Sequence, residues 1–306
     1  MGAVFLGTPS ASVPSLAALS DVADIDLVIT KPDSRAGRGG RQTQSPVKVA
    51  AQQFGFAVAQ PSSREELFSV LDAVQAEVGL VVAFGRILTP AMLATTSTGF
   101  LNVHFSLLPR WRGAAPVERA IASGDERTGV SLMKLDDGLD TGPIIGEIAT
   151  PIGDTETGGG LTARLSHLGA ALVDSLVPDY LNGRRVPVPQ LDTDPTVASR
   201  LSKDEALLTP DWDVIRAERS VRAFNPRPCA WMATPEGSIR IHACRITATP
   251  IDSGSIVLDG DRVIAGFSDG ALTLDVVQAP GKQPIAGLAW MNGRRGEPTS
   301  FTRQQL

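Results

Sequence analysis

The stretch from Phe100 to Ser106 (FLNVHFS) places three polar side chains where they could act together. Its apolar residues predict a strand, and side chains along a strand point alternately to its two faces. Asn102, His104 and Ser106 therefore share one face. Burying an amide, an imidazole or a hydroxyl without a partner would cost about 1–3 kcal/mol each. The pattern indicates a reaction centre, and a polar face in solvent or a hydrogen-bonded core histidine is the alternative.

Two segments further along the chain could complete a site around this strand. Residues 107–116 (LLPRWRGAAP) combine prolines and a glycine with Trp111 between two arginines, so the loop can offer main-chain groups and a flat apolar wall to a heterocycle. Residues 136–142 (DDGLDTG) form an acidic turn bounded by glycine. Its spacing does not match a calcium loop, and no Cys/His cluster favours a transition metal. We therefore expect no metal site.

Long ordered motifs resemble the formyltetrahydrofolate-dependent formyltransferases. The signature consists of NVHxSLLPRWRGAAP at 102–116 and DxGLDTG at 136–142. Further motifs resemble the methionyl-tRNA formyltransferase branch of that family: FLGTP (5–9), TKPDSRAGRG (30–39), SPVKVAA (45–51), AFGRILTP (83–90), LSKDEA (201–206) and RAFNPRPCAW (222–231). The resemblance covers nearly the whole chain. It implies a Rossmann-like N-terminal domain, and a C-terminal barrel resembling an OB-fold that helps to hold tRNA.

The resemblance also implies a reaction and a set of catalytic residues. The formyl group of 10-formyltetrahydrofolate, the co-substrate, would pass to the methionine amine of initiator Met-tRNA. An α-amino group has a pKa of roughly 7.7–8.0, so a useful fraction is neutral near pH 7 and no covalent enzyme nucleophile is required. By their match to the family, Asn102 and His104 would stabilise the oxyanion. Asp140 would orient His104 and help to manage the amine's proton.

Two further groups of binding residues follow from the same match. The family's folate-binding segment corresponds to Ser106, Leu107, Leu108 and Pro109, supported by Arg86, Ile87 and Leu88. The basic, glycine-rich loop from Lys31 to Gln44 corresponds to one that enters the tRNA acceptor stem, and Arg38 falls at the matched arginine. We expect Arg35, Arg38 and Arg41 to bind tRNA. A solvated surface loop is the alternative for this segment.

The sequence departs from the family pattern at two positions. Phe105 stands where glycine is usual, which affects the packing beneath the folate but leaves the shared face of Asn102 and His104 intact. Phe84 replaces a tyrosine that is often present, and this removes a hydroxyl group.

The elements that must position these residues follow from hydrophobic periodicity. Short apolar runs predict strands at 3–6, 25–30, 78–83, 100–104, 129–135 and 144–152, and helical patterns occupy 14–19, 47–54, 65–74, 89–94 and 161–181. This alternation predicts an α/β fold with an open sheet and helices on both sides. Short strands at 238–243, 255–258, 262–265 and 271–277 predict a small β-barrel. We expect a folate-binding catalytic domain at 1–182, a linker at 183–207 and an OB-like tRNA-binding domain at 208–306.

Composition restricts the class of protein. The chain has 306 residues and a net charge of −5. Residues 208–306 carry +1 and residues 1–207 carry −6, which permits an RNA-facing surface without demonstrating one. The two cysteines, Cys229 and Cys244, suit a reducing compartment, and no apolar run is long enough for a membrane helix. We expect a cytoplasmic protein with no membrane partner, and a monomer, as is general in the family.

Two alternatives remain open on the sequence alone. The same chemistry could serve a small-molecule amine or hydrolyse the formyl carrier, but neither activity needs residues 208–306 or the arginine loop. A non-catalytic folate- or RNA-binding module would not need Asn102, His104 and Asp140.

Overall fold

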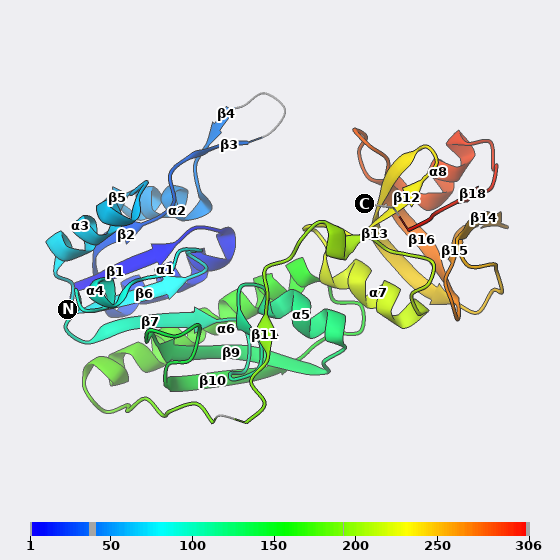
Figure 1. Cartoon of the computed structure of the whole chain (residues 1–306). Coiled ribbons are helices and arrows are strands. Elements are labelled where there is room, and N and C mark those ends of the chain that lie inside the picture. The colour runs from blue at the N-terminus through cyan, green and yellow to red at the C-terminus, as the bar shows by residue number, and fades with distance from the viewer. Residues whose placement is uncertain (1, 37–40, 192, 304–306) are drawn as a thin grey trace. The chain divides into compact units, whose positions relative to one another are not determined.

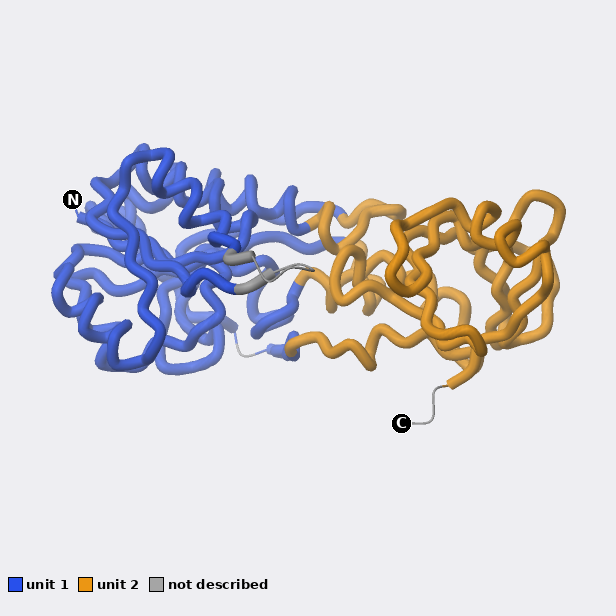
Figure 2. The backbone as a smooth tube through the Cα atoms, turned by 90° about the horizontal axis from the view of Figure 1, so that it is seen from above, with its two compact units in different colours: residues 1–116, 127–151, 162–199 blue, residues 117–126, 152–161, 200–306 orange. Residues whose placement is uncertain are grey.

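The chain folds into two compact units, each assembled from separate segments. The computed structural model describes residues 2–36, 41–191 and 193–303. Unit 1 comprises residues 1–116, 127–151 and 162–199, and unit 2 comprises residues 117–126, 152–161 and 200–306 (Figure 2). The chain therefore passes from one unit to the other at residues 116, 126, 151, 161 and 199.

Unit 1 is built on a mixed β-sheet (Figure 1). Its strands are β1 (Gly2–Gly7), β2 (Asp24–Ile29), β5 (Val58–Ala59), β6 (Val78–Val82), β7 (Gly99–His104), β9 (Arg127–Lys134) and β10 (Ile144–Pro151). They lie in the order β10-β9-β7-β6-β1-β2-β5, and the strands from β7 to β5 are mutually parallel. β9 is antiparallel to β7, and β10 to β9. The fully buried β6 (VGLVV) fits a parallel strand covered on both faces.

Helices cover both faces of this sheet. They are α1 (Val13–Val22), α2 (Pro46–Phe54), α3 (Arg64–Val74), α4 (Pro90–Leu93) and α6 (Gly158–Leu181). Ser45 caps α2 by accepting a hydrogen bond from the Lys48 amide, and Ser63 caps α3 in the same way from Glu66. The predicted helix and strand positions of unit 1 agree with these elements, which confirms the Rossmann-like fold.

The two faces of β7 have different neighbours. Phe100 is fully buried in a cluster with Leu67 of α3 and Met92 of α4. On the opposite face, a Cβ added at Gly169 of α6 would lie 2.6 Å from the Val103 side chain, so α6 packs closely there. Apolar packing thus holds the start of β7 on the Phe100 face, and the same face turns polar towards the carboxyl end of the strand.

Residues 184–191 and 193–198, here called the strap, return across unit 1 after α6. Val188 and Ile144 exchange backbone hydrogen bonds of 2.8 Å, and Arg185 Nε donates to the Ile145 carbonyl at 2.7 Å. Further along, β11 (Val197–Ala198) pairs in parallel with β8 (Arg112–Gly113). This pairing brings the strap to the loop that follows β7.

Unit 2 is an antiparallel β-barrel with three α-helices in its described residues. The strands are β12 (Trp231–Thr234), β13 (Gly237–Thr247), β14 (Ser255–Asp259), β15 (Arg262–Gly266), β16 (Ala271–Gln278), β17 (Ile285–Ala286) and β18 (Thr299–Ser300). The helices are α5 (Pro116–Ser123), α7 (Val214–Ala223) and α8 (Gly287–Gly293). The strand order is β12-β13-β16-β15-β14-β18. A bridge between Ala233 and Thr302 links the last strand region back to β12, so the sheet nearly closes. The predicted C-terminal barrel is confirmed, whereas α5, α7 and α8 were not predicted.

Along residues 2–36, 41–191 and 193–303, no helix combines the length and apolar character that a membrane crossing requires.

Phe301 lies next to the bridge that nearly closes the barrel, and its substitution tests the packing of the barrel core. Phe301 is 1 % exposed, and its ring centroid lies 5.3 Å from that of Phe267. Replacing Phe301 with alanine should lower the free energy of unfolding of unit 2 by about 3–5 kcal/mol, because it leaves a cavity in the core. Urea titration followed by tryptophan fluorescence measures this change. The exposed Arg303→Ala is the control, with an expected effect within about 0.5 kcal/mol. Equal urea midpoints for the two variants would contradict the prediction.

Candidate active site

β7 presents Asn102 and His104 on one face, as the alternation predicted, but it ends at His104, so the third predicted residue, Ser106, lies beyond the strand. His104 is only 5 % exposed, and its Nε2 lies 2.8 Å from the Trp111 carbonyl oxygen. Because a carbonyl oxygen can only accept a hydrogen bond, Nε2 must carry a proton. The main chain of the loop after β7 therefore fixes the orientation of the imidazole ring. This contact could not be predicted from residue types, since it uses a backbone atom.

Asp140 meets both of these side chains. The Asn102 Nδ2 donates to Asp140 Oδ1 at 3.4 Å, and His104 Nδ1 lies 3.6 Å from Asp140 Oδ2. The Gly113 amide donates a much shorter hydrogen bond, 2.8 Å, to the same Oδ2. The structure thus brings together Asn102, His104 and Asp140, which lie up to 38 positions apart in the sequence.

The geometry of this trio suits acyl transfer to an amine. The Asn102 and His104 contacts with Asp140 are long and hence weak. The Nδ2 of Asn102 is therefore available to donate to a developing oxyanion, and the Asp140 carboxylate is available to accept a proton. Asp140 has a side-chain exposure of 14 % and His104 one of 6 %, so water screens electrostatic interactions at this site little. Fixed donors in such a site stabilise a tetrahedral oxyanion without reorganising first.

The loop that carries Asp140 has an unusual backbone. Asp140 adopts φ 52°, in the left-handed region that non-glycine residues rarely occupy. The Asp136 carboxylate accepts hydrogen bonds from the Gly138 amide at 3.0 Å and the Thr141 hydroxyl at 2.7 Å. At Gly142, any Cβ would collide with the Lys134 carbonyl oxygen, so only glycine fits. The DDGLDTG pattern is therefore explained largely by the conformation of this turn.

Gln190 of the strap also belongs to the site, although no pattern in the sequence predicted it. Its Nε2 donates to the carbonyl oxygens of Asp140 and Gly142, both at 2.8 Å. Its Oε1 accepts from Nε and Nη2 of Arg112 at 3.0 and 2.7 Å. These partners lie 48 to 78 positions away, so no local pattern could reveal them.

The segment predicted to bind folate after β7 is held by internal hydrogen bonds. The Ser106 hydroxyl donates to the Arg110 carbonyl at 2.6 Å, and Ser106 is 1 % exposed. The buried Ser131 hydroxyl accepts from the Leu108 amide at 3.1 Å and donates to the Ser106 carbonyl at 2.7 Å. Leu107 and Pro109 are partly exposed, whereas Leu108 is buried.

The second predicted folate-binding group lies before α4 and divides into exposed and buried parts. Ile87 is 78 % exposed, whereas Leu88 is buried in the core with Met92. The Arg86 guanidinium donates to the carbonyl oxygens of Ser62 and Ser63, at 3.2 and 3.4 Å. Arg86 therefore ties this loop to the start of α3.

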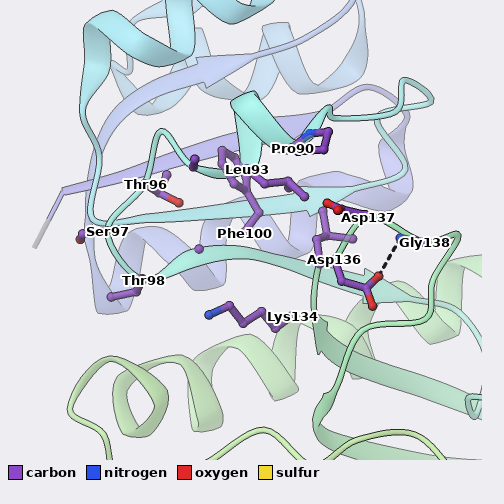
Figure 3. A pocket seen from close by; sticks show the side chains of 13 residues that line it. Pro90, Leu93, Thr96, Ser97, Thr98, Phe100, Lys134, Asp136, Asp137 and Gly138 are labelled. Atoms are coloured by element: carbon purple, nitrogen blue, oxygen red, sulfur yellow. Dashed lines mark hydrogen bonds between the residues drawn. The ribbon is translucent and has the colours of Figure 1, made fainter.

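A cavity of about 640 Å³ lies between α4, the start of β7 and the Asp140 loop (Figure 3). The described residues that line it are Pro90, Leu93, Ala94, Thr96, Ser97, Thr98, Gly99, Phe100, Lys134, Leu135, Asp136, Asp137 and Gly138. None of the predicted folate-binding residues is among them. Its volume falls in the range of small-molecule sites, and it combines an apolar wall with a turn that offers main-chain groups.

A second cavity, of about 430 Å³, lies beside the strap. It is lined by Arg112, Asp136, Thr141, Pro143, Pro189 and Gln190. Asp136 therefore belongs to both cavities, and the Asp140 loop forms part of the wall of each.

The arginine loop has a firmly bonded base. Its stems are β3 (Ser34–Ala36) and β4 (Arg41–Thr43), which are antiparallel, while Arg38 lies outside the described residues. Near this base, Lys48 Nζ and Gln60 Nε2 each donate to the Asp33 carboxylate at 2.7 Å. The hydrogen bond from Lys48 has the largest effect on the pKa of Asp33 and, together with that from Gln60, holds it below its usual range. This network fixes the point at which the loop leaves the sheet.

The two departures from the family pattern are both packed in unit 1. Phe84 is 1 % exposed and belongs to the core cluster of α3 and α4. Phe105 is 9 % exposed and lies on the α6 side of the sheet, where a Cβ at Gly169 would be 3.7 Å from its ring. Phe105 thus points away from the face of Asn102 and His104.

Comparison with known proteins shows the family. The formyl transferase family model matches residues 3–176, and the model of the formyl transferase C-terminal domain matches residues 200–295. The methionyl-tRNA formyltransferase of Halorhodospira halophila is 41 % identical over 303 residues, covering 96 % of this chain and 98 % of the relative. That of Xylella fastidiosa is 42 % identical over 306 residues, covering 96 % and 98 %.

Solved structures share the fold. An N-formyltransferase from Helicobacter canadensis, in complex with folinic acid and dTDP-3-aminofucose, superimposes with a TM-score of 0.67 at 19 % identity, covering 89 % of this chain and 98 % of that one. The methionyl-tRNA formyltransferase from Clostridium thermocellum gives a TM-score of 0.55 at 17 % identity, with coverage of 81 % and 94 %. With both family models matched in order along a chain that carries the trio, the protein belongs to the formyl transferase family.

Proposed function

We propose that this protein transfers the formyl group of 10-formyltetrahydrofolate to the free amine of methionine on initiator Met-tRNA, giving formyl-Met-tRNA for translation initiation. The observation that carries the proposal is the contact of Asp140 with Asn102 and His104 in a family member whose full-length relatives are methionyl-tRNA formyltransferases. The product is used in translation, so we place the enzyme in the cytoplasm. We expect a monomer.

The proposed reaction is a single acyl transfer. The neutral amine attacks the formyl carbon, and the carbonyl becomes a tetrahedral oxyanion. The Asn102 amide donates to this oxyanion, and the His104 Nε2–H donates to it in place of its hydrogen bond to the Trp111 carbonyl. Asp140 accepts the proton that the amine nitrogen loses. The oxyanion then collapses, the bond from carbon to the folate nitrogen breaks, and that nitrogen takes up a proton. Formylated amine and tetrahydrofolate result, with no net gain or loss of protons.

We place the folate heterocycle in the cavity between α4 and the Asp140 loop. Leu93 and Ala94 supply an apolar wall, and the backbone from Leu135 to Gly138 supplies polar groups beside it. The segment of Ser106, Leu107, Leu108 and Pro109, and the group of Arg86, Ile87 and Leu88, would then flank the rest of the folate. In this proposal residues 1–182 form the catalytic domain, residues 183–207 the linker and residues 208–306 the tRNA-binding domain.

The decisive experiment supplies purified protein with 10-formyltetrahydrofolate and one of three acceptors: charged initiator Met-tRNA, charged elongator Met-tRNA or free methionine. Formyl incorporation confined to the initiator tRNA supports the proposal. Transfer to free methionine alone would retain the formyl chemistry but contradict the tRNA acceptor. Formate release without transfer would show a hydrolase.

We also propose that Arg35, Arg38 and Arg41 bind the tRNA acceptor stem. Contacts of arginine with phosphate release counterions, so affinity falls with salt. Each Arg→Ala variant should raise KM for Met-tRNA and lower the slope of log(kcat/KM) against log[salt] by up to about 1, while KM for the folate stays unchanged. Kinetics from 50 to 200 mM KCl measure this slope. Arg64→Ala, an exposed arginine of α3, is the matched control. An equal slope in all four variants would contradict the assignment.

A further inference from the structure

The strap residue Gln190 has its side-chain amide fully engaged. The two hydrogens of Nε2 go to the Asp140 and Gly142 carbonyl oxygens, and the two lone pairs of Oε1 face Nε and Nη2 of Arg112. An amide with both donors and both acceptor positions satisfied has a single orientation. We call these two side chains the Arg112–Gln190 clamp.

The clamp binds the backbone of Asp140, which adopts a strained conformation. A non-glycine residue at φ 52° costs about 1–3 kcal/mol relative to an ordinary conformation, and persists where surrounding contacts over-determine it. For Asp140, the Gly113 amide holds the carboxylate and Gln190 holds the carbonyl group. Both ends of the residue are therefore fixed.

The clamp itself is anchored independently of the loop. On one side, Val188 pairs with Ile144, and Arg185 bonds to Ile145, so the strap is attached to β10 before it reaches Gln190. On the other side, Arg112 lies in β8, which pairs with β11, and its backbone amide donates to the Thr196 carbonyl at 2.9 Å. A displaced Asp140 loop would therefore have to break bonds to an immobilised partner.

We infer that Gln190, presented by the strap and oriented by Arg112, is a positioning residue for formyl transfer: it holds the Asp140 carboxylate in register with Asn102 and His104. This inference rests on the proposed function. Gln190 acts through Asp140, and a misplacement of about 1 Å in such a group can cost about 10²-fold in rate. The segment expected to be a linker thereby contributes to the reaction centre.

The loop held by the clamp also forms part of the wall of both cavities, through Asp136. Its position therefore sets the boundary between them as well as the place of the carboxylate. A loosened loop should affect turnover more than the binding of Met-tRNA.

Two substitutions separate the two halves of the clamp. Gln190→Ala removes all four hydrogen bonds. Gln190→Glu keeps an acceptor for Arg112 but cannot donate to Asp140 and Gly142. If donation to the loop is what matters, both variants should lose about 10- to 100-fold in kcat, with KM for Met-tRNA within about twofold of the original. Arg184→Ala, which removes an exposed ion pair of the strap with Asp179 and touches neither the clamp nor its anchors, is the matched control and should retain kcat within about twofold.

A second measurement does not depend on turnover. The chain has three histidines, so the ring-nitrogen NMR signals of ¹⁵N-histidine-labelled protein can be assigned with His104→Asn. Gln190→Ala should shift the His104 signals and leave those of His167 and His242 in place, because only His104 faces Asp140.

The outcomes are distinguishable. Retained kcat in Gln190→Glu, an equal loss in Arg184→Ala, or unshifted His104 signals in Gln190→Ala would overturn the inference. An unsubstituted enzyme that transfers no formyl group to Met-tRNA would overturn the proposed function, and the His104 signals would still decide whether Gln190 holds the loop.

Discussion

Replacing Asp140 with asparagine should lower kcat for formyl transfer by about 10³–10⁴-fold, the size of loss seen when an orienting aspartate of a catalytic triad becomes asparagine. The carboxylate accepts on both oxygens, from the Asn102 Nδ2 and from the Gly113 amide. An asparagine amide has one oxygen and one NH2 group, so one of these donors would face another donor. The variant also lacks the negative charge beside His104 and the acceptor for the amine's proton.

The charge-matched control for this variant is Asp174→Asn, on the exposed side of α6. Initial rates with saturating Met-tRNA and folate, on proteins with equal thermal midpoints, measure the effect. A loss below about tenfold in Asp140→Asn would show that the carboxylate neither orients His104 nor takes up the proton.

Replacing His104 with asparagine should cost about 10²–10³-fold in kcat, the usual effect of losing one oxyanion donor. The shorter side chain cannot reach both the Trp111 carbonyl and Asp140, which the imidazole spans with Nε2 and Nδ1. His167→Asn, an exposed histidine of α6, is the matched control and should retain the original kcat.

The double variant of His104→Asn and Asp140→Asn makes this test sharper. Residues that act as a unit give non-additive losses, so the double variant should be about as slow as the slower single variant. Multiplied losses would mean that the two side chains contribute independently, which contradicts the proposed roles.

The reaction centre was predictable as far as it depended on side-chain alternation and long motifs. Alternation along the predicted strand gave the shared face of Asn102 and His104, which the structure has on β7, although β7 ends at His104 and Ser106 lies beyond it. Apolar runs such as VGLVV likewise indicated the order of strands and helices in the first half of the chain.

Other features lacked a local signal. Trp111 contributes a carbonyl group, which every residue possesses, and the strap has no helical or alternating pattern to show that it packs on unit 1. Helix α7 is different, because its signal was present. Asp213 caps it by accepting from the Arg216 amide, and Val214, Ala217 and Val221 recur at helical spacing on its buried side.

The assembly of unit 2 from three stretches of chain limits how this protein can be divided or recombined. Arg119 pairs with Glu205 at 2.6 Å, the Gly159 amide donates to the Asn225 carbonyl at 2.9 Å, and Arg222 Nη1 donates to the Glu156 carbonyl at 3.4 Å. A fragment that begins at Arg200 would carry only one half of each pair. The barrel is therefore not a transplantable module, and a truncated gene, a domain fusion or an exchange between relatives has to carry residues 117–126 and 152–161 along with it.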